Sequence, residues 1–186
     1  MERATDVLTG EHRGIERMLR IMEVAVERLE HGEQVPADVF ERSADFIRGF
    51  ADKCHHAKEE KNLFPLLERR GIPRQGPIGV MLAEHAEGRR YAGGFADAIS
   101  GHERGDEAAR QAVIDNAKAY IGLLRAHILK EDHVLFPMAD KALSDTDQSD
   151  LAERFEQVEA EEIGEGVHER YHGMIGELER ALGIAG

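Results

Sequence analysis

Two stretches of this sequence repeat one another and place histidine and glutamate on what is otherwise an apolar helical face. The phrase HHAKEEKNLFP begins at His55, and the phrase HILKEDHVLFP begins at His127. Alignment on the shared LFP pairs Glu59 with Glu131, so each copy holds a histidine four residues before a glutamate. Residues at positions i and i+4 lie one above the other on a helix. The repeat therefore predicts two helices that each turn a histidine and a glutamate toward one point.

A second element of the repeat lies upstream of each phrase. His12 stands 43 positions before the first phrase, His85 stands 42 positions before the second, and a glutamate precedes each of them. Each half of the chain thus reads Glu-His, one crossing from helix to helix, and then His-x-x-x-Glu. Neighbouring residues on a helix point in different directions. We therefore expect Glu11 and Glu84 to face solvent or to form an outer shell around the histidines.

Apolar residues recur at helical spacing through most of the chain, and no segment shows the alternation of a strand. The predicted helices span residues 4–31, 37–70, 78–103, 107–142 and 151–183. Short connections between helices of this length favour antiparallel neighbours. We predict an all-α fold, an antiparallel up-down four-helix bundle of residues 1–143. Residues 144–186 are expected to add a C-terminal fifth helix packed on the bundle, after a polar stretch at Ser144–Asp150.

Six ionisable residues interrupt the apolar stripes of the predicted bundle at comparable depth. A glutamate or histidine that points into a core costs several kcal/mol unless it is paired, protonated or bound to a cation. Four imidazoles and two carboxylates suit a pair of transition-metal ions and leave coordination positions open for water, an oxo group or an oxygen-derived ligand. We predict a metal site at these residues: His12, His55, Glu59, His85, His127 and Glu131.

The combined pattern resembles the hemerythrin-like (HHE cation-binding) family over residues 5–140. The motifs that carry the resemblance are Glu11-His12, His55-x-x-x-Glu59 with LFP, Glu84-His85, and His127-x-x-x-Glu131 with LFP. The resemblance implies two iron ions, oxo- or hydroxo-bridged, with Glu59 and Glu131 bridging them. Manganese and zinc stay open as alternatives.

One position departs from the oxygen-carrying members of that family. Those members have a further histidine on the third helix, one turn beyond the position of His85, where this chain has Arg89. The departure disfavours simple reversible oxygen carriage. The chain looks more like family members linked to iron or oxygen sensing, to peroxide or nitric oxide handling, and to iron-centre repair.

The composition is acidic, with 24 basic against 37 acidic residues and a net charge of −13. Nucleic acid and anionic membranes attract basic patches, so neither is an expected partner. No apolar run approaches the roughly 20 residues of a membrane-spanning helix, and the polar N-terminus does not resemble a signal peptide. We expect a cytoplasmic protein, a monomer or homodimer, whose partner is a small diatomic or peroxide ligand.

Residues close to the predicted ligands have structural interpretations of their own. His56 follows His55 but points about 100° away on an α-helix, so a surface or outer-shell place is favoured over a supplementary ligand. The other neighbours are interpreted as outer-face charges at Glu60, Asp132 and His133, core packing at Cys54 and Tyr120, and helix bending at Pro65 and Pro137.

The predicted fifth helix allows two interpretations. The residues that raise the question share one face of it: Glu162, Glu165 and His168. In the first interpretation an acidic amphipathic helix covers the bundle, and Gly164 and Gly166 allow a kink or a break. In the second the helix closes the site, and His168 or a nearby glutamate completes the coordination lost at Arg89.

Two functions are compatible with this sequence. The first is a non-haem di-iron protein that reacts with or senses dioxygen, peroxide or nitric oxide, in oxidative or nitrosative stress or in iron handling. The alternative is a metal-stapled structural or sensor module without catalytic turnover. A hydrolase is disfavoured because the sequence shows neither a Gly-rich phosphate loop nor a Ser-His-Asp pattern.

Overall fold

The computed structural model describes residues 3–36, 38–164 and 166–184, and this part of the chain is helical with no strand in it. Helix α1 spans Ala4–Glu30. The α2–α3 segment, residues 39–69, is one continuous rod that joins α2 (Val39–Phe46), η1 (Ile47–His56), η2 (Glu59–Leu63) and α3 (Phe64–Arg69), where η marks π-helical winding. The turn η3 (Arg74–Ile78) leads into α4 (Gly79–Glu103). The α5–α6 segment, residues 107–142, joins α5 (Glu107–Lys130), η4 (Glu131–Leu135) and α6 (Phe136–Ala142). The last elements are α7 (Asp145–Val158), η5 (Glu159–Ile163) and α8 (Val167–Ala181).

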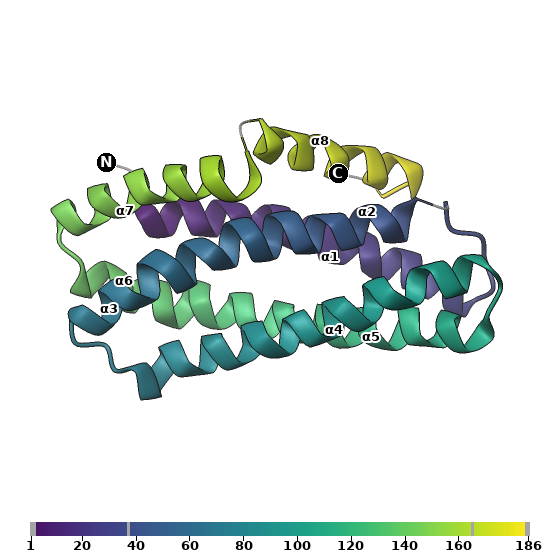
Figure 1. Cartoon of the computed structure of the whole chain (residues 1–186), viewed down its shortest axis with the longest axis horizontal. Helices are drawn as coiled ribbons and strands as arrows, with labels where there is room; N and C mark the ends of the chain where they lie inside the picture. The colour runs from purple at the N-terminus through teal and green to yellow at the C-terminus, as the bar shows by residue number, and fades with distance from the viewer. Residues whose placement is uncertain (1–2, 37, 165, 185–186) are drawn as a thin grey trace.

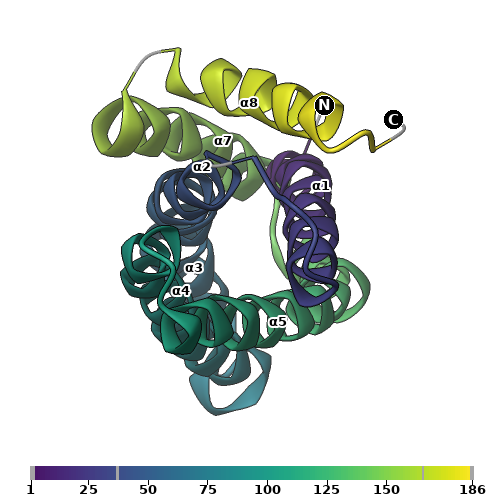
Figure 2. The same cartoon turned by 90° about the vertical axis from the view of Figure 1, so that its right-hand side faces the viewer.

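The long helical segments lie side by side, and consecutive ones run in opposite directions (Figure 1). Viewed end-on, α1, the α2–α3 segment, α4 and the α5–α6 segment surround a common interior (Figure 2). Helices α7 and α8 lie outside this ring, against α1 and the α2–α3 segment. The predicted all-α bundle is confirmed, while the division of the chain between residues 143 and 144 stays a prediction.

Two apolar clusters fill the interior and leave a belt of ionisable residues between them. On α1, Leu8 belongs to one cluster and Ile15 to the other, with His12 between them. The α2–α3 segment repeats the arrangement, with Phe50 in the second cluster and Leu63 in the first. Each fully buried aliphatic or aromatic side chain stabilises the fold by about 1.5–3 kcal/mol. The two clusters therefore offset the cost of burying the polar belt.

Each copy of the repeat contains a π-helical turn that begins at its glutamate. Segment η2 begins at Glu59 and precedes Pro65, and η4 begins at Glu131 and precedes Pro137. A proline has no N–H, and its ring clashes with the carbonyl four residues earlier, so the helix widens there instead of continuing its α-helical bonds. The loosening expected at the prolines thus begins six residues before them, directly at the glutamates.

The C-terminal region differs from the single predicted helix. Helix α7 begins at Asp145, because Ser144 accepts a hydrogen bond from the Asp147 N–H, and the Asp147 carboxylate accepts one in return. The stretch interpreted as a polar lead-in is therefore the first turn of α7. The chain breaks between α7 and α8 at Gly164 and Gly166, whose φ values of 90° and 75° suit glycine.

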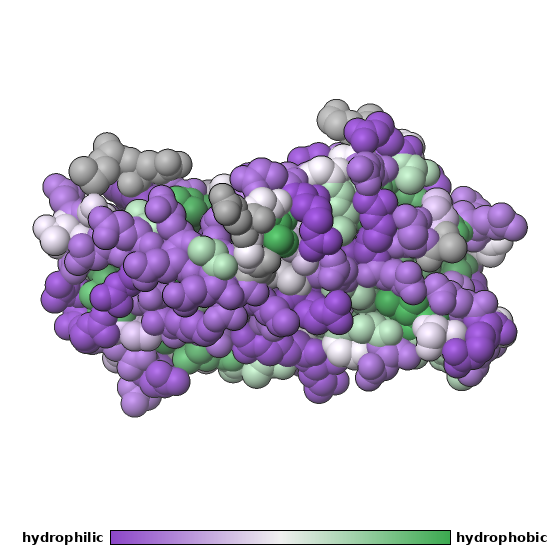
Figure 3. Space-filling view, turned by 45° about the horizontal axis from the view of Figure 1, so that its top comes forward, coloured by the Kyte–Doolittle hydropathy of each residue, from purple (hydrophilic) through white to green (hydrophobic). Residues whose placement is uncertain are grey.

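Helix α8 packs tightly against the first half of the α2–α3 segment. Gly49 of η1 lies so close to Tyr171 of α8 that a Cβ at Gly49 would overlap the tyrosine hydroxyl. That hydroxyl donates a 3.4 Å hydrogen bond to the backbone carbonyl of Asp45. The face that carries α7 and α8 is largely hydrophilic (Figure 3). In the described part of the chain, no helix has both the length and the apolar character needed to cross a membrane.

Candidate metal centre

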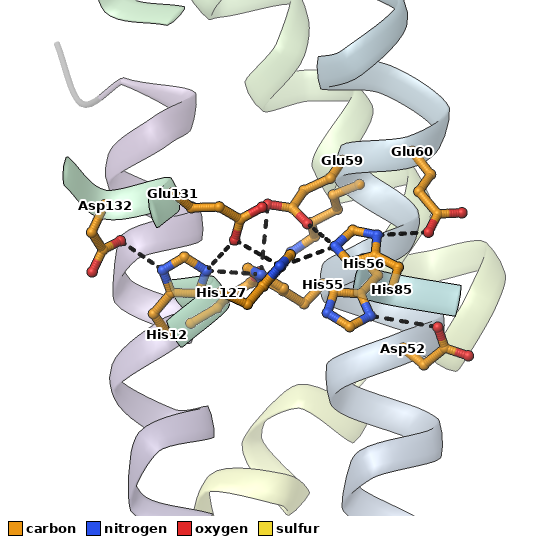
Figure 4. Close-up of polar contacts among 12 residues, drawn as sticks. His12, Asp52, His55, His56, Glu59, Glu60, His85, His127, Glu131 and Asp132 are labelled. Atoms are coloured by element: carbon orange, nitrogen blue, oxygen red, sulfur yellow. Dashed lines mark hydrogen bonds and ion pairs between the residues drawn. The ribbon is translucent and has the colours of Figure 1, made fainter. Parts of the chain in front are cut away.

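The residues predicted as metal ligands meet in the polar belt between the two apolar clusters (Figure 4). They come from every long segment of the bundle: His12 on α1, His55 and Glu59 on the α2–α3 segment, His85 on α4, and His127 and Glu131 on the α5–α6 segment. Each is at most 1% exposed. The Nε2 atoms of His12 and His55 lie 3.0 Å apart, and those of His85 and His127 lie 3.1 Å apart. The histidines therefore form two pairs.

The two buried glutamates connect the histidine pairs. The Glu131 carboxylate lies 3.2 Å from Nε2 of His12 and 3.3 Å from Nε2 of His127, one histidine of each pair. The Glu59 carboxylate lies 3.7 Å and 3.4 Å from Nε2 of the other two histidines. Each carboxylate therefore reaches both pairs, which is the position of a carboxylate that bridges two ions.

The ligand atoms divide into two groups, each compact enough to hold one ion. The first group is His12, His55, Glu59 and Glu131, and the second is His56, Glu59, His85 and His127; within each, the ligand atoms lie within 4.8 Å of one another. Glu59 belongs to both groups. The geometry thus offers two adjacent metal positions that share a carboxylate.

An outer ring of carboxylates orients the four histidines. Each Nδ1 lies 2.7–2.9 Å from one carboxylate, in the pairs His12–Asp132, His55–Glu11, His85–Glu60 and His127–Glu84. When Nδ1 donates to a carboxylate, the Nε2 lone pair is left to face inward, as metal-ligating histidines require. The outer-shell expectation for Glu11 and Glu84 agrees with these contacts. Glu11 is only 3% exposed, so the solvent-facing alternative is wrong for it.

The inner carboxylates lack hydrogen bonds within the described part of the chain. All four oxygen atoms of Glu59 and Glu131 are buried there without a partner. Burial and the neighbouring Glu131 charge raise the pKa of Glu59 well above its usual range. Burial lowers the pKa of His12, but its hydrogen bond with Asp132 and the nearby Glu131 carboxylate outweigh that effect and raise the pKa to about 9. Protons on Glu59 and His12 thus balance the negative charge of the buried carboxylates. Bound dications could replace those protons, so this donor set fits metal ions.

The surface position considered for His56 is wrong, whereas its place in the outer shell or as a supplementary ligand stays a prediction. It is 4% exposed, and neither ring nitrogen has a hydrogen-bond partner. Its ring stacks on His85 with centroids 3.9 Å apart, which puts it beside the second group. It lies at the end of the π-helical segment η1. Because π-helical winding turns by less per residue than an α-helix, His55 and His56 both reach the interior.

The two halves of the repeat differ in how their lysines are covered. Lys58 contacts the Glu11 carboxylate and, on its other side, Glu159 of η5, and its side chain is 0% exposed. The matching Lys130 contacts Glu84 but is 43% exposed. Cys54 is packed beside Lys58, and burial raises its pKa to about 12. An inert core thiol fits the expectation for Cys54.

The predicted contribution of the C-terminal region to coordination is not found at Glu162 or His168. Glu162 pairs with Lys61 at the surface, and His168 Nε2 lies 3.9 Å from the outer carboxylate of Glu11. Neither residue belongs to a four-residue group of the centre. The remaining candidate, Glu165, lies outside the described residues. The fourth member of the group that contains His85 and His127 is instead His56.

Arg89 forms ion pairs with two carboxylates beside the site. Its guanidinium donates to Asp52 at 2.7 Å and to Glu60 at 2.8 Å. Glu60 also accepts a hydrogen bond from His85, so this outer charge orients a histidine as well. Asp132 orients His12 in the same way. Both residues directly follow a glutamate of the repeat, and this shared acidic position was the sequence signal that could have predicted their role.

Comparison with known proteins agrees with the site geometry. The family described as hemerythrin HHE cation binding domain matches residues 3–139. Uncharacterized proteins of Mycobacterium bovis and Mycobacterium tuberculosis are 30% identical over 181 residues, a match that covers 97% of this chain and 71% of theirs. No solved structure matches the chain. The matched residues include both copies of the repeat and the whole His/Glu cluster, and the chain belongs to the hemerythrin HHE cation-binding domain family.

Proposed function

We propose that this chain is a non-haem di-iron protein, with oxo- or hydroxo-bridged ions, that reacts with or senses dioxygen, peroxide or nitric oxide. The observation that carries the proposal is the pair of buried carboxylates, Glu59 and Glu131, whose oxygen atoms lack hydrogen-bond partners while each approaches both histidine pairs. Such carboxylates are costly in a core unless cations bind between them. The proposed ligands are the six predicted residues together with His56.

The mixed donor set supports iron over structural zinc. Closed structural zinc sites hold four ligands and favour cysteine and histidine. Mixed histidine and carboxylate sets with open positions are typical of non-haem iron, and manganese shares the preference for six ligands.

The protein residues have distinct parts in this mechanism. Bound iron supplies a redox couple to the site. The outer carboxylates Glu11, Glu60, Glu84 and Asp132 hold the Nδ1 protons of the histidines, which fixes the rings and raises their basicity. The two apolar clusters on either side of the belt exclude bulk water. Reaction or sensing then depends on small ligands reaching the buried centre.

The alternative function is a metal-stapled structural or sensor module without turnover. It is favoured by the contact of Lys58 with Glu11 on one side and with Glu159 on the other. Since Glu11 also holds His55, this chain of contacts connects the metal centre to the C-terminal helices. We retain from the sequence the proposals of a cytoplasmic monomer or homodimer without nucleic-acid or membrane partners.

The test is a metal count and an absorption spectrum on protein purified without a metal-affinity tag. We expect about two irons per chain and near-ultraviolet bands of an oxo-bridged pair, both lost in a double variant His127→Ala, Glu131→Ala. The variant His133→Ala removes an exposed histidine next to the site and serves as the matched control, with no change expected. Zinc in the native protein, or fewer than one metal per chain after anaerobic iron loading, contradicts the redox proposal and favours the alternative.

A further inference from the structure

A pocket of about 390 Å³ opens between the α2–α3 segment and α4 and reaches the proposed metal centre. Small or apolar residues form most of its wall: Ala44, Ile47, Gly88, Ala92, Gly93 and Ala96. A Cβ added at Gly93 would meet nothing within 4 Å, and one at Gly88 would meet only atoms 3.7 Å away. The space beside Gly93 is therefore open, and a side chain at Gly88 would pack against Tyr120 of the pocket wall.

Polar groups line one part of this apolar pocket. His56 belongs to the wall, 4% exposed and with both ring nitrogens unpaired. Its Nδ1 lies 3.6 Å from the carboxylate of Asp52, another wall residue, which is too far for a direct hydrogen bond. Tyr120, 2% exposed, also lines the pocket and makes no side-chain hydrogen bond within the described part of the chain. The pocket therefore presents hydrogen-bond donors and an acceptor alongside its small and apolar residues.

The gap between His56 and Asp52 suits a hydroxyl group. A polar contact longer than about 3.5 Å can be bridged by a group that both donates and accepts. If His56 presents Nε2 to the metal, its Nδ1 carries a hydrogen, so a hydroxyl oxygen would accept from Nδ1 and its hydrogen would be donated to Asp52. A ligand end that only donates would leave Nδ1 of His56 unpaired, and one that only accepts would leave Asp52 with Arg89 as its partner.

The charges around the pocket favour a neutral ligand. Both arginines of the wall are already paired, Arg89 with Asp52 and Glu60, and Arg48 with Asp45 at 3.3 Å. Among the described residues that line the pocket, no cation is left unpaired to attract a carboxylate or a phosphate. A chain with a net charge of −13 also repels anions at long range.

We propose that this pocket binds a small uncharged organic molecule with an apolar body and one hydroxyl or hydroperoxyl end, with that end between His56 and Asp52. An apolar cavity of about 150 Å³ is enough for benzene, so a body of roughly six to ten carbon atoms fits the volume of about 390 Å³. Dioxygen, nitric oxide and hydrogen peroxide are far smaller than this space. As a substrate site, the pocket rests on the proposed metal centre and would make organic hydroperoxides or alcohols its preferred ligands.

The probe is 2-phenylpropan-2-ol, titrated by calorimetry into the full chain in metal-free and iron-loaded forms, with cumene hydroperoxide in a parallel metal-free titration. We expect saturable binding to both forms, weakened at least tenfold by Ala92→Leu, which fills the pocket. Ala96→Leu fills it from the next turn of α4, so the test survives if one variant fails to fold. Ala86→Leu changes an exposed alanine of α4 that is not among the pocket residues and is expected to bind normally. The tighter of the two probes identifies the alcohol or the hydroperoxide as the natural class.

The outcomes separate this inference from the proposed function. Two irons per chain without saturable binding of either probe overturns the pocket ligand and leaves the di-iron centre standing. Probe binding that the filling variants abolish, in a protein that takes up no iron, supports the pocket and contradicts the redox function. Equal binding by the wild type and both filling variants places the probe elsewhere and also overturns the inference.

Discussion

Replacing His56 with isoleucine is expected to act in opposite directions on the metal-free and the iron-loaded protein. Isoleucine is the residue at the matching place of the other repeat, where Ile128 is 2% exposed. The buried imidazole of His56 has two unpaired nitrogens, and its neighbours include His55 and His85. The variant tests whether this histidine is a ligand or an ordinary core residue.

In the metal-free protein the replacement should stabilise the fold. A buried polar group without a partner costs about 1–3 kcal/mol, which isoleucine removes at similar volume. For a chain of 150–250 residues, 1 kcal/mol shifts Tm by about 2–4 °C. We therefore expect Tm of metal-free His56→Ile to rise by roughly 3–9 °C.

In the iron-loaded protein the same replacement removes one proposed ligand from the group that also contains His85 and His127. Loss of an outer-shell partner alone typically lowers metal affinity by about 10–100-fold, and loss of a ligand should be at least as severe. The iron held by the group of His85 and His127 should therefore be lost first during titration with a chelator. The group of His12 and His55 should keep its ion.

Thermal unfolding of both forms and chelator competition followed by absorbance measure the two effects. His133→Ala, an exposed histidine in the same region, is the control and should change neither quantity. A lower Tm in the metal-free variant together with unchanged binding of the iron at His85 and His127 would show that His56 is a packed core residue and refute the reasoning.

The other predictions concern the outer shell, pH and helix docking. Glu84→Gln should lower iron affinity by about 10–100-fold in chelator competition, because Glu84 accepts from Nδ1 of His127 at 2.9 Å; unchanged affinity would contradict the orienting role. Hydrogen bonds from Arg125, outweighing burial, lower the pKa of Glu23 to about 2. This half-buried group should therefore contribute stability above its ordinary pKa of 4.5 that is lost as the pH falls toward 2. After solvent screening the contribution is at most about 1 kcal/mol, so the Tm difference between wild type and Glu23→Gln should shrink between pH 6 and pH 3, and a constant difference would argue against it. Gly49→Ala should push α8 off the bundle and cost about 1–3 kcal/mol, seen as faster hydrogen exchange in α8, whereas exchange equal to that of the wild type would contradict the tight contact.

The helices and the approximate position of the candidate metal centre follow from the sequence alone. Helical spacing shows which residues share a face, so His55 with Glu59 and His127 with Glu131 could be placed together from local geometry alone. Repetition of the same order of residues in both halves then predicted that their faces meet, and the structure brings all six residues within the same buried belt. Whether they bind metal stays a prediction.

Tertiary structure decided the contacts that depend on the exact winding of a helix or on a partner from another segment. His56 reaches the interior because η1 is π-helical, and no local spacing rule for an α-helix predicts that. The partner of each Nδ1 comes from another segment of the bundle, as in the contact of His12 with Asp132, so it is fixed by how the segments pack. Likewise, Lys58 and Lys130 occupy matching places in the repeat, but only Lys58 is buried, because Glu159 of the C-terminal region lies over it. Sequence periodicity sets which face of a helix turns inward, whereas packing between segments sets what that face meets.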